Sequence, residues 1–338
     1  MRKVTSQEVA KRAGVSQSAV SRVFTPGASA SDKTVLKVRE AAEELGYRPN
    51  ILARSLITGK SRIIGLIVAY LDNYFYPSAL EKLSNVLQKK GYHVLVFMAS
   101  NDNQSTEKVI EELLDYQVDG IIIASVGISN NVTERCEANG VPVVLFNRSQ
   151  DQKSHSSVTS DNLEGGKTAA RFLCEAGNER IAYIGGWVGA STQRDREAGF
   201  RDGLKSYGQS LFDYALGDFS SDIAKKVAHK MFVGLKRPDA VFVATDHMAF
   251  AVMDVLRSGL GLSIPRDVSV VGYDDVPPAA WAGYNLTTLR QRANFMVEET
   301  VRIMIDKISD PKAGPQHIKI SSPLIVRGSA KIPEGWSK

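Results

Sequence analysis

The chain has 338 residues, of which 43% are apolar and 23% charged, and its formal net charge is +5. This length allows two or three domains with a substantial core. No apolar run approaches the ~20 residues that a membrane span needs, and the first ten residues, MRKVTSQEVA, contain no apolar segment of a secretory signal. We therefore expect a cytoplasmic protein that does not engage a membrane.

The cysteines and histidines give no sign of a metal or redox site. Cys136 and Cys174 are the only cysteines, and they lie in separate helical patterns. Two thiols without CxxC spacing are typical of reduced packing residues. The five histidines are not spaced as ligands, so we expect neither a metal ion nor a cofactor.

The positive charge is concentrated at the N-terminus. Residues 1–62 contain twelve Lys or Arg and five Asp or Glu, a net charge of +7, whereas the remaining 276 residues carry a net charge of −2. A small basic module is suited to polyanions, because each phosphate that it neutralises releases counterions. A solvated basic arm is the alternative interpretation.

The stretch VTSQEVAKRAGVSQSAVSRVF, residues 4–24, predicts two short helices joined by a tight turn. Thr5 and Glu8 have the spacing of a capping box. Gly14 fits the left-handed residue that ends a helix, and Ser16 is placed to cap the second helix. Two helices joined by a short turn with glycine form the helix-turn-helix pattern.

In a helix-turn-helix the second helix lies in the major groove, and its N-terminal residues reach base edges. Gln17 and Ser18 begin this helix, and Ser21 and Arg22 lie one turn on. Gln can pair with adenine and Arg with guanine, each worth about 1–3 kcal/mol of discrimination. The alternative is a helical hairpin whose polar residues only face solvent.

A third helix is predicted over residues 31–46. Ser31 is placed to cap it, apolar residues recur at spacings of three and four, and Gly46 ends it. This helix completes a small core, so we expect a headpiece over residues 1–48.

The segment RPNILARSLITGK, residues 48–60, predicts one or two helical turns that need a partner to form. Pro49 interrupts the chain, Asn50 can cap the turn, and Ala53 and Arg54 precede Leu56. A leucine wedge inserted into a minor groove is one way to stabilise such a segment, and an interdomain linker is the other. We assign residues 49–61 as a hinge.

From residue 62 the pattern alternates between apolar runs and amphipathic segments, which is typical of doubly wound α/β folds. There are too many strands for one ordinary sheet. We therefore expect residues 62–338 to form two lobes, one mainly over 62–160 and one mainly over 161–285, with the C-terminal segment crossing between them. The predicted strands are 63–69, 93–99, 119–125, 141–147, 180–186, 239–245 and 268–274, and the predicted helices are 79–90, 104–117, 161–176, 194–208, 221–234, 246–259 and 293–308.

Polar residues follow most of the predicted strands. Examples are DNYFYP after the first strand, NRSQD after the fourth, TDH at 245–247 and YDD at 273–275. Ligands of such folds bind beyond the carboxyl ends of the strands. Convergence of these segments predicts a polar ligand with several hydroxyl or amide groups, bounded by aromatic faces.

These features together resemble the lac repressor/purine repressor (LacI/GalR) family. The resemblance rests on VTSQEVAKRAGVSQSAVSRVF, the turn ELGYRPN and the segment ARSL, and it extends over the whole chain. It implies an all-α helix-turn-helix headpiece followed by an α/β core of two lobes like a type I periplasmic binding protein. It also implies a homodimer whose headpieces read an inverted repeat in double-stranded operator DNA, with Leu56 intercalated in the central minor groove. The residues assigned to DNA contact are Thr5, Ser16, Gln17, Ser18, Ser21, Arg22, Asn50, Ala53, Arg54 and Leu56.

The same resemblance places an effector between the lobes. Arg196 matches the family's cleft arginine and Asp274 the aspartate opposite it. Purine-binding relatives carry a second arginine where this chain has Ala190, which favours a sugar or related polyol. For Asp246 and Asp275, helix capping is at least as good an interpretation as ligand contact. The residues assigned to the effector are Phe75, Tyr76, Asn147, Arg148, Asp161, Thr192, Arg196, Phe219, Thr245 and Asp274.

Two other classes of protein compete with a DNA-binding regulator. The turn GGWVG at 185–189 lacks the GxGxxG order of a nucleotide-dependent enzyme, and no GxSxG, P-loop or HExxH motif occurs. A solute-binding component of a transporter would need an export signal and would not need the basic headpiece. We therefore expect a non-enzymatic transcriptional regulator, a repressor, whose small effector acts allosterically.

Overall fold

The computed structural model describes residues 4–25, 28–48, 60–69, 71–99, 103–125, 130–152 and 154–337. The chain divides into two compact units, residues 1–61 and residues 62–338, and each is described by itself. No helix in the described part of the chain is long and apolar enough to cross a membrane.

The first unit is a three-helix headpiece. Helix α1 spans Ser6–Ala13, α2 spans Gln17–Val23 and α3 spans Asp32–Leu45. The predicted capping box is present, because the Thr5 side chain accepts from the Glu8 backbone and the Glu8 carboxylate accepts from the Thr5 backbone. Gly14 ends α1 in the left-handed region at φ 65°, which glycine adopts without steric cost. The predicted helix-turn-helix is confirmed.

A small apolar core holds the headpiece helices together. Val9, Val20 and Val38 are fully buried and come from the three different helices. Ala10 is buried as well, and its small side chain allows α1 and α2 to cross closely. These residues form one apolar face on each helix, directed at the other two.

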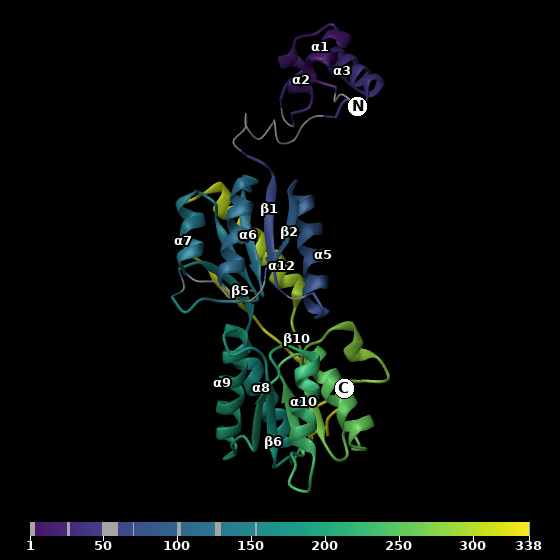
Figure 1. Ribbon diagram of the computed structural model, residues 1–338, viewed down its shortest axis with the longest axis vertical. Coiled ribbons are helices and arrows are strands. Elements are labelled where there is room, and N and C mark those ends of the chain that lie inside the picture. Colours follow the sequence, from purple (N-terminus) through teal and green to yellow (C-terminus); the bar gives the residue numbers. More distant parts are fainter. Residues whose placement is uncertain are drawn as a thin grey trace. The chain divides into compact units, whose positions relative to one another are not determined.

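The second unit contains two six-stranded, mainly parallel sheets, one in each lobe (Figure 1). The strand order is β11-β5-β4-β3-β1-β2 in the first sheet and β12-β10-β9-β8-β6-β7 in the second. The strands are β1 (Ile63–Val68), β2 (His93–Met98), β3 (Gly120–Ala124), β4 (Val143–Phe146), β5 (Ser156–Ser160), β6 (Ile181–Gly185), β7 (Asp213–Leu216), β8 (Ala240–Val243), β9 (Ser269–Asp274), β10 (Thr287–Arg290), β11 (His317–Ile320) and β12 (Leu324–Ile325).

Helices cover both lobes, as a doubly wound fold requires. The first lobe carries α5 (Phe75–Lys89), α6 (Asn103–Asp115), α7 (Asn130–Ala138) and α12 (Ala293–Ser309), and the second carries α8 (Asn162–Glu175), α9 (Ser191–Ser206), α10 (Ser221–Phe232) and α11 (Asp246–Asp254), which a π-helical turn continues over Val255–Gly259. The predicted fold class is confirmed by this arrangement.

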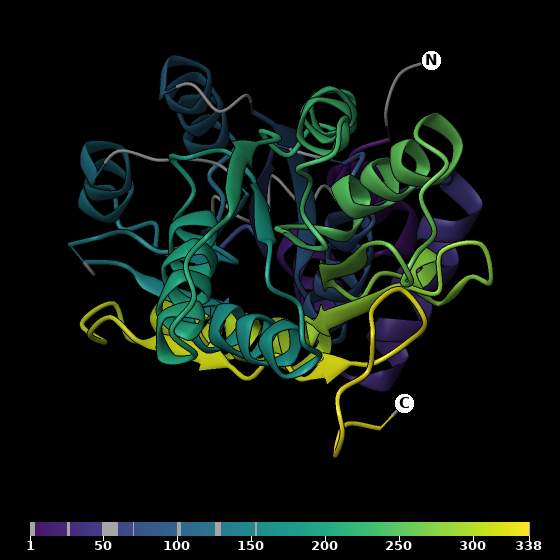
Figure 2. The same ribbon diagram turned by 90° about the horizontal axis from the view of Figure 1, so that it is seen from below.

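The chain passes between the lobes three times. It leaves the first sheet after β5, returns from β10 to α12, and passes from β11 to β12. Figure 2 shows the C-terminal segment, in yellow, running along one side of the two lobes. The three connections place the carboxyl ends of both sheets at one inter-lobe cleft.

Some elements were not predicted because their sequences are polar. Strand β5 reads SSVTS, yet every residue in it is buried between β4 and β11. Its hydroxyls are satisfied internally: the Ser156 Oγ accepts from Gln316 N at 3.1 Å, and the Ser160 Oγ donates to Gln291 Oε1 at 2.9 Å. Strand β10 (TTLR) was missed for the same reason, and β7 (DYAL) because it is only four residues long. Helix α7, in which Cys136 lies, was not among the predicted helices because its sequence is largely polar.

Glycines allow α8 and α9 to pack closely in the second lobe. A Cβ on Gly199 would lie 1.9 Å from the Leu163 carbonyl oxygen, and one on Gly166 would lie 2.3 Å from the Arg196 carbonyl oxygen. Both obstacles are backbone atoms of the facing helix, which cannot rotate away. This close approach fixes the position of the helix that carries Thr192 and Arg196.

We therefore predict that Gly199→Ala destabilises the protein by at least ~2 kcal/mol, because the added methyl overpacks the helix pair. Gly259→Ala is the matched control, since its Cβ would meet only a Val255 methyl group at 3.9 Å. Urea unfolding followed by circular dichroism measures both. An equal effect of the two substitutions would show that the α8–α9 contact is not close.

Candidate functional site

A cleft lies between the lobes at the carboxyl ends of the strands. Its lining residues come from the ends of β4, β8 and β9, from the connection between β7 and α10, from the starts of α5, α9 and α11, and from the connection between β10 and α12. They are Asn73, Phe75, Tyr76, Asn147, Arg148, Thr192, Arg196, Phe219, Thr245, His247, Asp274 and Gln291.

The structure brings nine of the ten residues assigned to the effector into this cleft. The exception is Asp161, which caps α8 by accepting from the Glu164 backbone at 3.2 Å and does not line the cleft. Asn73, His247 and Gln291 line it without having been assigned. Asn73 and His247 belong to polar segments that follow strands, whereas Gln291 follows β10, a strand that the sequence pattern did not indicate.

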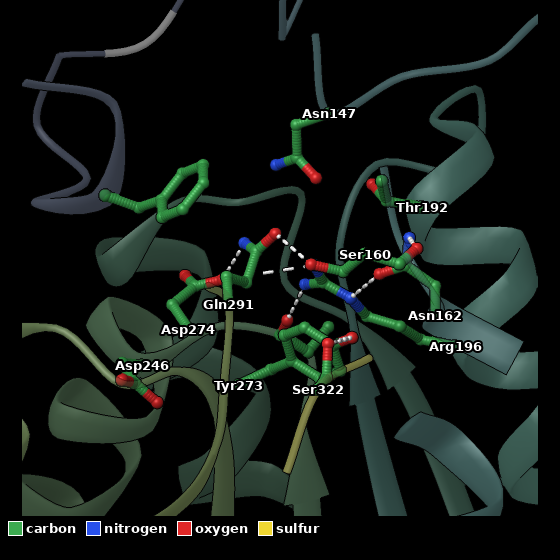
Figure 3. A network of polar contacts seen from close by, with 12 residues as sticks. Asn147, Ser160, Asn162, Thr192, Arg196, Asp246, Tyr273, Asp274, Gln291 and Ser322 are labelled. Carbon is green, nitrogen blue, oxygen red and sulfur yellow. Dashed lines mark hydrogen bonds and ion pairs between the residues drawn. The ribbon is translucent and has the colours of Figure 1, made fainter. Parts of the chain in front are cut away.

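Arg196 is the central residue of the cleft floor (Figure 3). Its side chain is 2% exposed, and its Nε donates to Asn162 Oδ1 at 2.8 Å. One terminal nitrogen donates to the Ala244 carbonyl, and the other lies 3.9 Å from Asp274 Oδ1. The guanidinium carbon lies 3.5 Å from the centre of the Tyr273 ring, a cation–π contact. Arg196 therefore joins α8, α9, β8 and β9 at one point.

Gln291 connects Asp274 to the first lobe. Its Nε2 donates to Asp274 Oδ1 at 2.6 Å, and its Oε1 accepts from Ser160 Oγ at 2.9 Å. Figure 3 shows Asn147 across the cleft from this network, with its side chain directed into the space between. The two walls of the cleft thus present amide and carboxylate groups to each other.

The loop after β4 binds the start of α9 across the cleft. Arg148 donates to Asn147 O and Thr192 Oγ1, each at 2.8 Å, and to Ser125 O at 3.3 Å. The backbone N–H of Ser149 donates to Ser191 Oγ at 3.0 Å. These contacts close one side of the cleft, so separating the lobes requires them to break.

Buried polar atoms without a hydrogen-bond partner gather in this cleft. Among the described residues seven such side-chain atoms occur, and five of them belong to cleft-lining residues. Buried polar groups are nearly always paired, so this concentration indicates a site built for a polar ligand. The five atoms are Asn147 Oδ1, Arg148 Nε, Thr245 Oγ1, His247 Nδ1 and Asp274 Oδ2.

The unpartnered atoms favour a ligand rich in hydrogen-bond donors. Asn147 Oδ1 and Asp274 Oδ2 can only accept. His247 Nε2 lies 2.8 Å from the Phe219 carbonyl and donates to it, while Nδ1 has no partner and faces the ligand. Arg148 Nε is a donor, and the Thr245 hydroxyl can act either way. Hydroxyl groups can both donate and accept, so they can pair with all five atoms. An anionic ligand group would be repelled by the carboxylate of Asp274.

Several cleft residues adopt unusual backbone conformations. Asn147, Phe219 and Asp274 have φ values of 55°, 55° and 128°. Non-glycine residues at positive φ cost of order 1–3 kcal/mol and cluster at functional sites. Each of these residues lies at the end of a strand or shortly after one, so the strained backbone there directs its side chain into the cleft.

The cleft is narrow. The room left for water among the lining side chains is about 20 Å³, which corresponds to roughly one or two water molecules. A molecule of the size of a monosaccharide therefore needs the lobes to separate. Binding and lobe movement are coupled for this steric reason.

Two buried carboxylates flank the cleft floor. Burial raises the pKa of Asp274, while the nearby Arg196 opposes that effect. Burial and the neighbouring Asp274 raise the pKa of Asp246 to about 8. Asp246 accepts from Val276 N at 3.0 Å and from Thr288 Oγ1 at 2.6 Å and does not line the cleft. It connects α11 to β10 and to the segment after β9, and does not cap α11 with its side chain. Asp275 likewise forms ion pairs with Arg290 and Arg327.

The described residues contain no cluster of His, Cys, Asp or Glu that could hold a metal ion.

In the headpiece, α2 presents its predicted DNA-contact residues to solvent. Gln17, Ser18, Ser21 and Arg22 are all exposed. Gln17 Nε2 donates to Ser6 Oγ at 2.9 Å, and Ser18 Oγ lies 2.9 Å from Ser16 Oγ. Ser16 caps α2 and Thr5 caps α1, so these two residues set the helix ends. Asn50, Ala53, Arg54 and Leu56 lie outside the described residues.

Fold and site together define a ligand-binding α/β protein of two lobes that carries a helix-turn-helix headpiece. Comparison with known families agrees with both parts. Residues 5–50 match the family described as bacterial regulatory proteins, lacI family, and residues 64–282 match a periplasmic binding protein domain. The chain belongs to the lacI family of bacterial regulatory proteins.

Full-length relatives support this membership. The chain is 30% identical to the HTH-type transcriptional repressor PurR of Erwinia tasmaniensis, with 96% of each chain covered. It is 29% identical to the ribose operon repressor of Escherichia coli K12, covering 96% of this chain and 99% of the relative. The structure of the lac repressor dimer bound to operator and the anti-inducer ONPF matches with a TM-score of 0.87 at 26% identity, over 97% and 99% of the two chains.

A complex of the transcriptional regulator CelR with cellobiose is also similar. It matches with a TM-score of 0.73 at 29% identity, over 97% of this chain and 100% of that chain.

The buried Asp246 generates a pH prediction. Its pKa in the folded protein is about 8, against 3.8 for an unperturbed aspartate side chain. The folded state therefore retains a proton that the unfolded chain releases, and stability falls as the pH rises through this window, by up to ~1.4 kcal/mol per pH unit. In Asp246→Asn the amide oxygen can accept from Val276 and the amide nitrogen can donate to the Thr288 hydroxyl. We predict that the variant gains stability over the wild type from about pH 4 to about pH 8.

Thermal unfolding of both proteins across this range measures the difference. A stability difference that does not vary with pH would contradict the raised pKa.

Proposed function

We propose that this chain is a repressor that binds an inverted-repeat operator as a homodimer, under the control of a sugar or sugar derivative held between its lobes. The observation that carries the proposal is the set of five unpartnered, buried polar atoms that face one inter-lobe cleft in a member of the lacI family. The proposal involves binding at two sites and no chemical step.

The aromatic walls support a sugar. Phe75, Tyr76 and Phe219 line the cleft, and aromatic faces pack against the apolar face of a sugar ring while polar groups bind its hydroxyls. Position 190 is a buried alanine at the start of α9, so no second arginine is present there for a purine. The relatives whose names mention ribose and cellobiose agree with this ligand class.

The lobe-bridging contacts supply a mechanism for control. A ligand in the cleft touches Asn147 and Arg148 of the first lobe and Arg196, His247 and Asp274 of the second. It thereby changes the free energy of lobe separation. When the lobes of each subunit move, the first lobes of the two subunits change their distance and orientation in the dimer. The coupling acts equally in both directions, so operator binding alters effector affinity by the same factor.

An exposed edge of the first sheet supports a dimer. Strand β2 lies at that edge, and its Val96 and Met98 are 51% and 50% exposed. Exposed apolar residues on an edge strand are normally covered by another element or chain.

We assign residues 49–61 as the hinge that links each headpiece to its core, with Leu56 as the minor-groove wedge; most of this segment lies outside the described residues.

The proposed role of α2 predicts a loss of specificity in Arg22→Gln. Arg22 is exposed in the last turn of α2, and loss of a base contact costs about 1–3 kcal/mol. The operator is first obtained by selection from a random DNA pool. Fluorescence anisotropy then measures affinity for the selected site and for random DNA.

Arg39→Gln is the control, because it removes the same charge from the exposed face of α3. We expect Arg22→Gln to weaken binding to the selected site more than to random DNA, and Arg39→Gln to weaken both equally. An equal loss in the two variants would remove Arg22 from base recognition.

The proposed cleft predicts loss of effector affinity in Asn147→Gly. Glycine accepts the φ of 55° at this position, so the substitution removes the amide without straining the turn. We expect effector affinity measured by calorimetry to fall by about tenfold, since a buried hydrogen bond contributes ~1 kcal/mol and the facing hydroxyl loses its acceptor. Operator affinity without effector should stay at the wild-type level; unchanged effector affinity would place the ligand elsewhere.

A further inference from the structure

A second cavity lies beside the effector cleft and is not used by the proposed function. Its volume is about 430 Å³, and it lies among the start of α5, the end of β9 and the crossover from β10 to α12. Its walls therefore belong to both lobes. By the same measure the effector cleft has only about 20 Å³, so this second cavity accepts a small organic molecule without lobe movement.

The cavity has an excess of positive charge. Lys82, Arg290 and Arg292 line it together with the carboxylates of Asp274 and Asp275. Both carboxylates already have arginine partners: Arg327 and Arg290 bind Asp275 at 2.6 Å and 2.5 Å, and Arg196 lies 3.9 Å from Asp274. Because Arg290 is held by Asp275, Lys82 and Arg292 are the cations that a ligand can engage.

The cavity cations remain accessible. Lys82 Nζ donates to Ser78 Oγ at 2.8 Å. This hydrogen bond uses one of the three N–H donors of the ammonium group, and the neutral hydroxyl does not balance its charge. Arg292 is exposed at the start of α12, where the helix dipole adds to the positive potential. Lysine and arginine that converge from different elements are the usual means of binding a phosphate group.

Exposed aromatic rings stand beside these cations. Tyr74 is 49% exposed and Phe295 is 55% exposed, and both line the cavity. The Arg292 guanidinium carbon lies 5.9 Å from the centre of the Phe295 ring. Such rings offer a flat apolar surface next to the cationic groups, which suits a ligand with an anionic group joined to an apolar or planar body.

The two cavities share a wall. Phe75, Asp274 and Gln291 line both of them, and Gln291 Nε2 donates to Asp274 Oδ1 at 2.6 Å within that wall. A molecule in the second cavity therefore contacts side chains that also face the effector. Occupation of one cavity changes the position and hydrogen bonding of groups in the other.

We propose that this second cavity is a binding site for a small organic phosphate, a phosphate ester on a planar or apolar body, which modulates the response to the cleft ligand. The Lys82 and Arg292 side chains bind the phosphate oxygens, and Tyr74 and Phe295 pack against the body of the ligand. The site is distinct from the effector cleft, and its presence does not depend on which compound the cleft binds.

The test uses the full-length protein and phenyl phosphate as the probe, with inorganic phosphate and benzoate in parallel at constant ionic strength. Isothermal titration calorimetry measures the dissociation constants. We expect phenyl phosphate to bind more tightly than inorganic phosphate or benzoate. Phe295→Ala should reduce its affinity to that of inorganic phosphate, because the ring contact is lost.

The decisive comparison is between two double variants. Lys82→Gln with Arg292→Gln should weaken phenyl phosphate binding about tenfold. The control, Lys89→Gln with Lys205→Gln, removes the same charge from exposed helix positions and should leave the binding unchanged. Equal affinities in the two double variants, equal binding of benzoate, or no binding of phenyl phosphate at millimolar concentration would each overturn the proposal.

Arg148→Gln separates the second cavity from the cleft. Binding that is lost in this variant but kept in the Lys82 and Arg292 double variant would place the phosphate in the effector cleft and overturn the assignment. None of these outcomes bears on whether a sugar binds the cleft, so the two proposals fail independently.

Discussion

The buried guanidinium of Arg196 is the interaction on which the cleft depends. It joins the start of α8 through Asn162, the end of β8 through the Ala244 carbonyl, and the end of β9 through Asp274 and the face of Tyr273. A buried charge is tolerated only when it is paired and hydrogen-bonded. In the second lobe this requirement brings the start of α8 and the ends of β8 and β9 together around Arg196. The close packing of α8 against α9 at their glycines holds in place the helix that carries the arginine.

The first lobe faces this floor with groups that are held less completely. Asn147 follows β4 at positive φ, and the next two residues, Arg148 and Ser149, contact Thr192 and Ser191 of the second lobe. These contacts can be exchanged for contacts with a ligand at little net cost, because both sets are hydrogen bonds between polar groups. The lobes can therefore be held together either by their own contacts or by contacts with a ligand. Allosteric control requires two such arrangements of comparable free energy.

The sequence predicted the parts of this structure that hydrophobic periodicity and capping chemistry determine. The headpiece helices end where Thr5, Gly14, Ser16 and Gly46 indicate, and the apolar runs became the strands at the centre of each sheet. Strand β5 escaped prediction because its serines and threonine are buried between β4, the preceding strand, and β11, which lies far away in the sequence.

In the cleft, too, some residues could be assigned from the local sequence and others could not. Asn147 and Asp274, which end two predicted strands, were assigned from that position together with the family resemblance. Gln291 was missed because the importance of its position arises from the crossover between the lobes, which local sequence does not reveal. Asp161 was assigned from the family pattern, but in the structure it caps α8. The second cavity, beside Phe295, could not be predicted at all, since three segments that lie far apart in the sequence build it.

The central claim is that the inter-lobe cleft binds a neutral, hydroxyl-rich ligand and that this binding controls the headpieces. The most direct measurement is a thermal-shift screen of the full-length protein against sugars, polyols, sugar acids and nucleobases, followed by operator-binding assays with each compound that stabilises it. A ligand that binds only the native state raises the melting temperature. We predict that a neutral sugar or polyol does so and that the same compound changes operator affinity. Stabilisation by nucleobases alone, or by a sugar that leaves operator affinity unchanged, would contradict the claim.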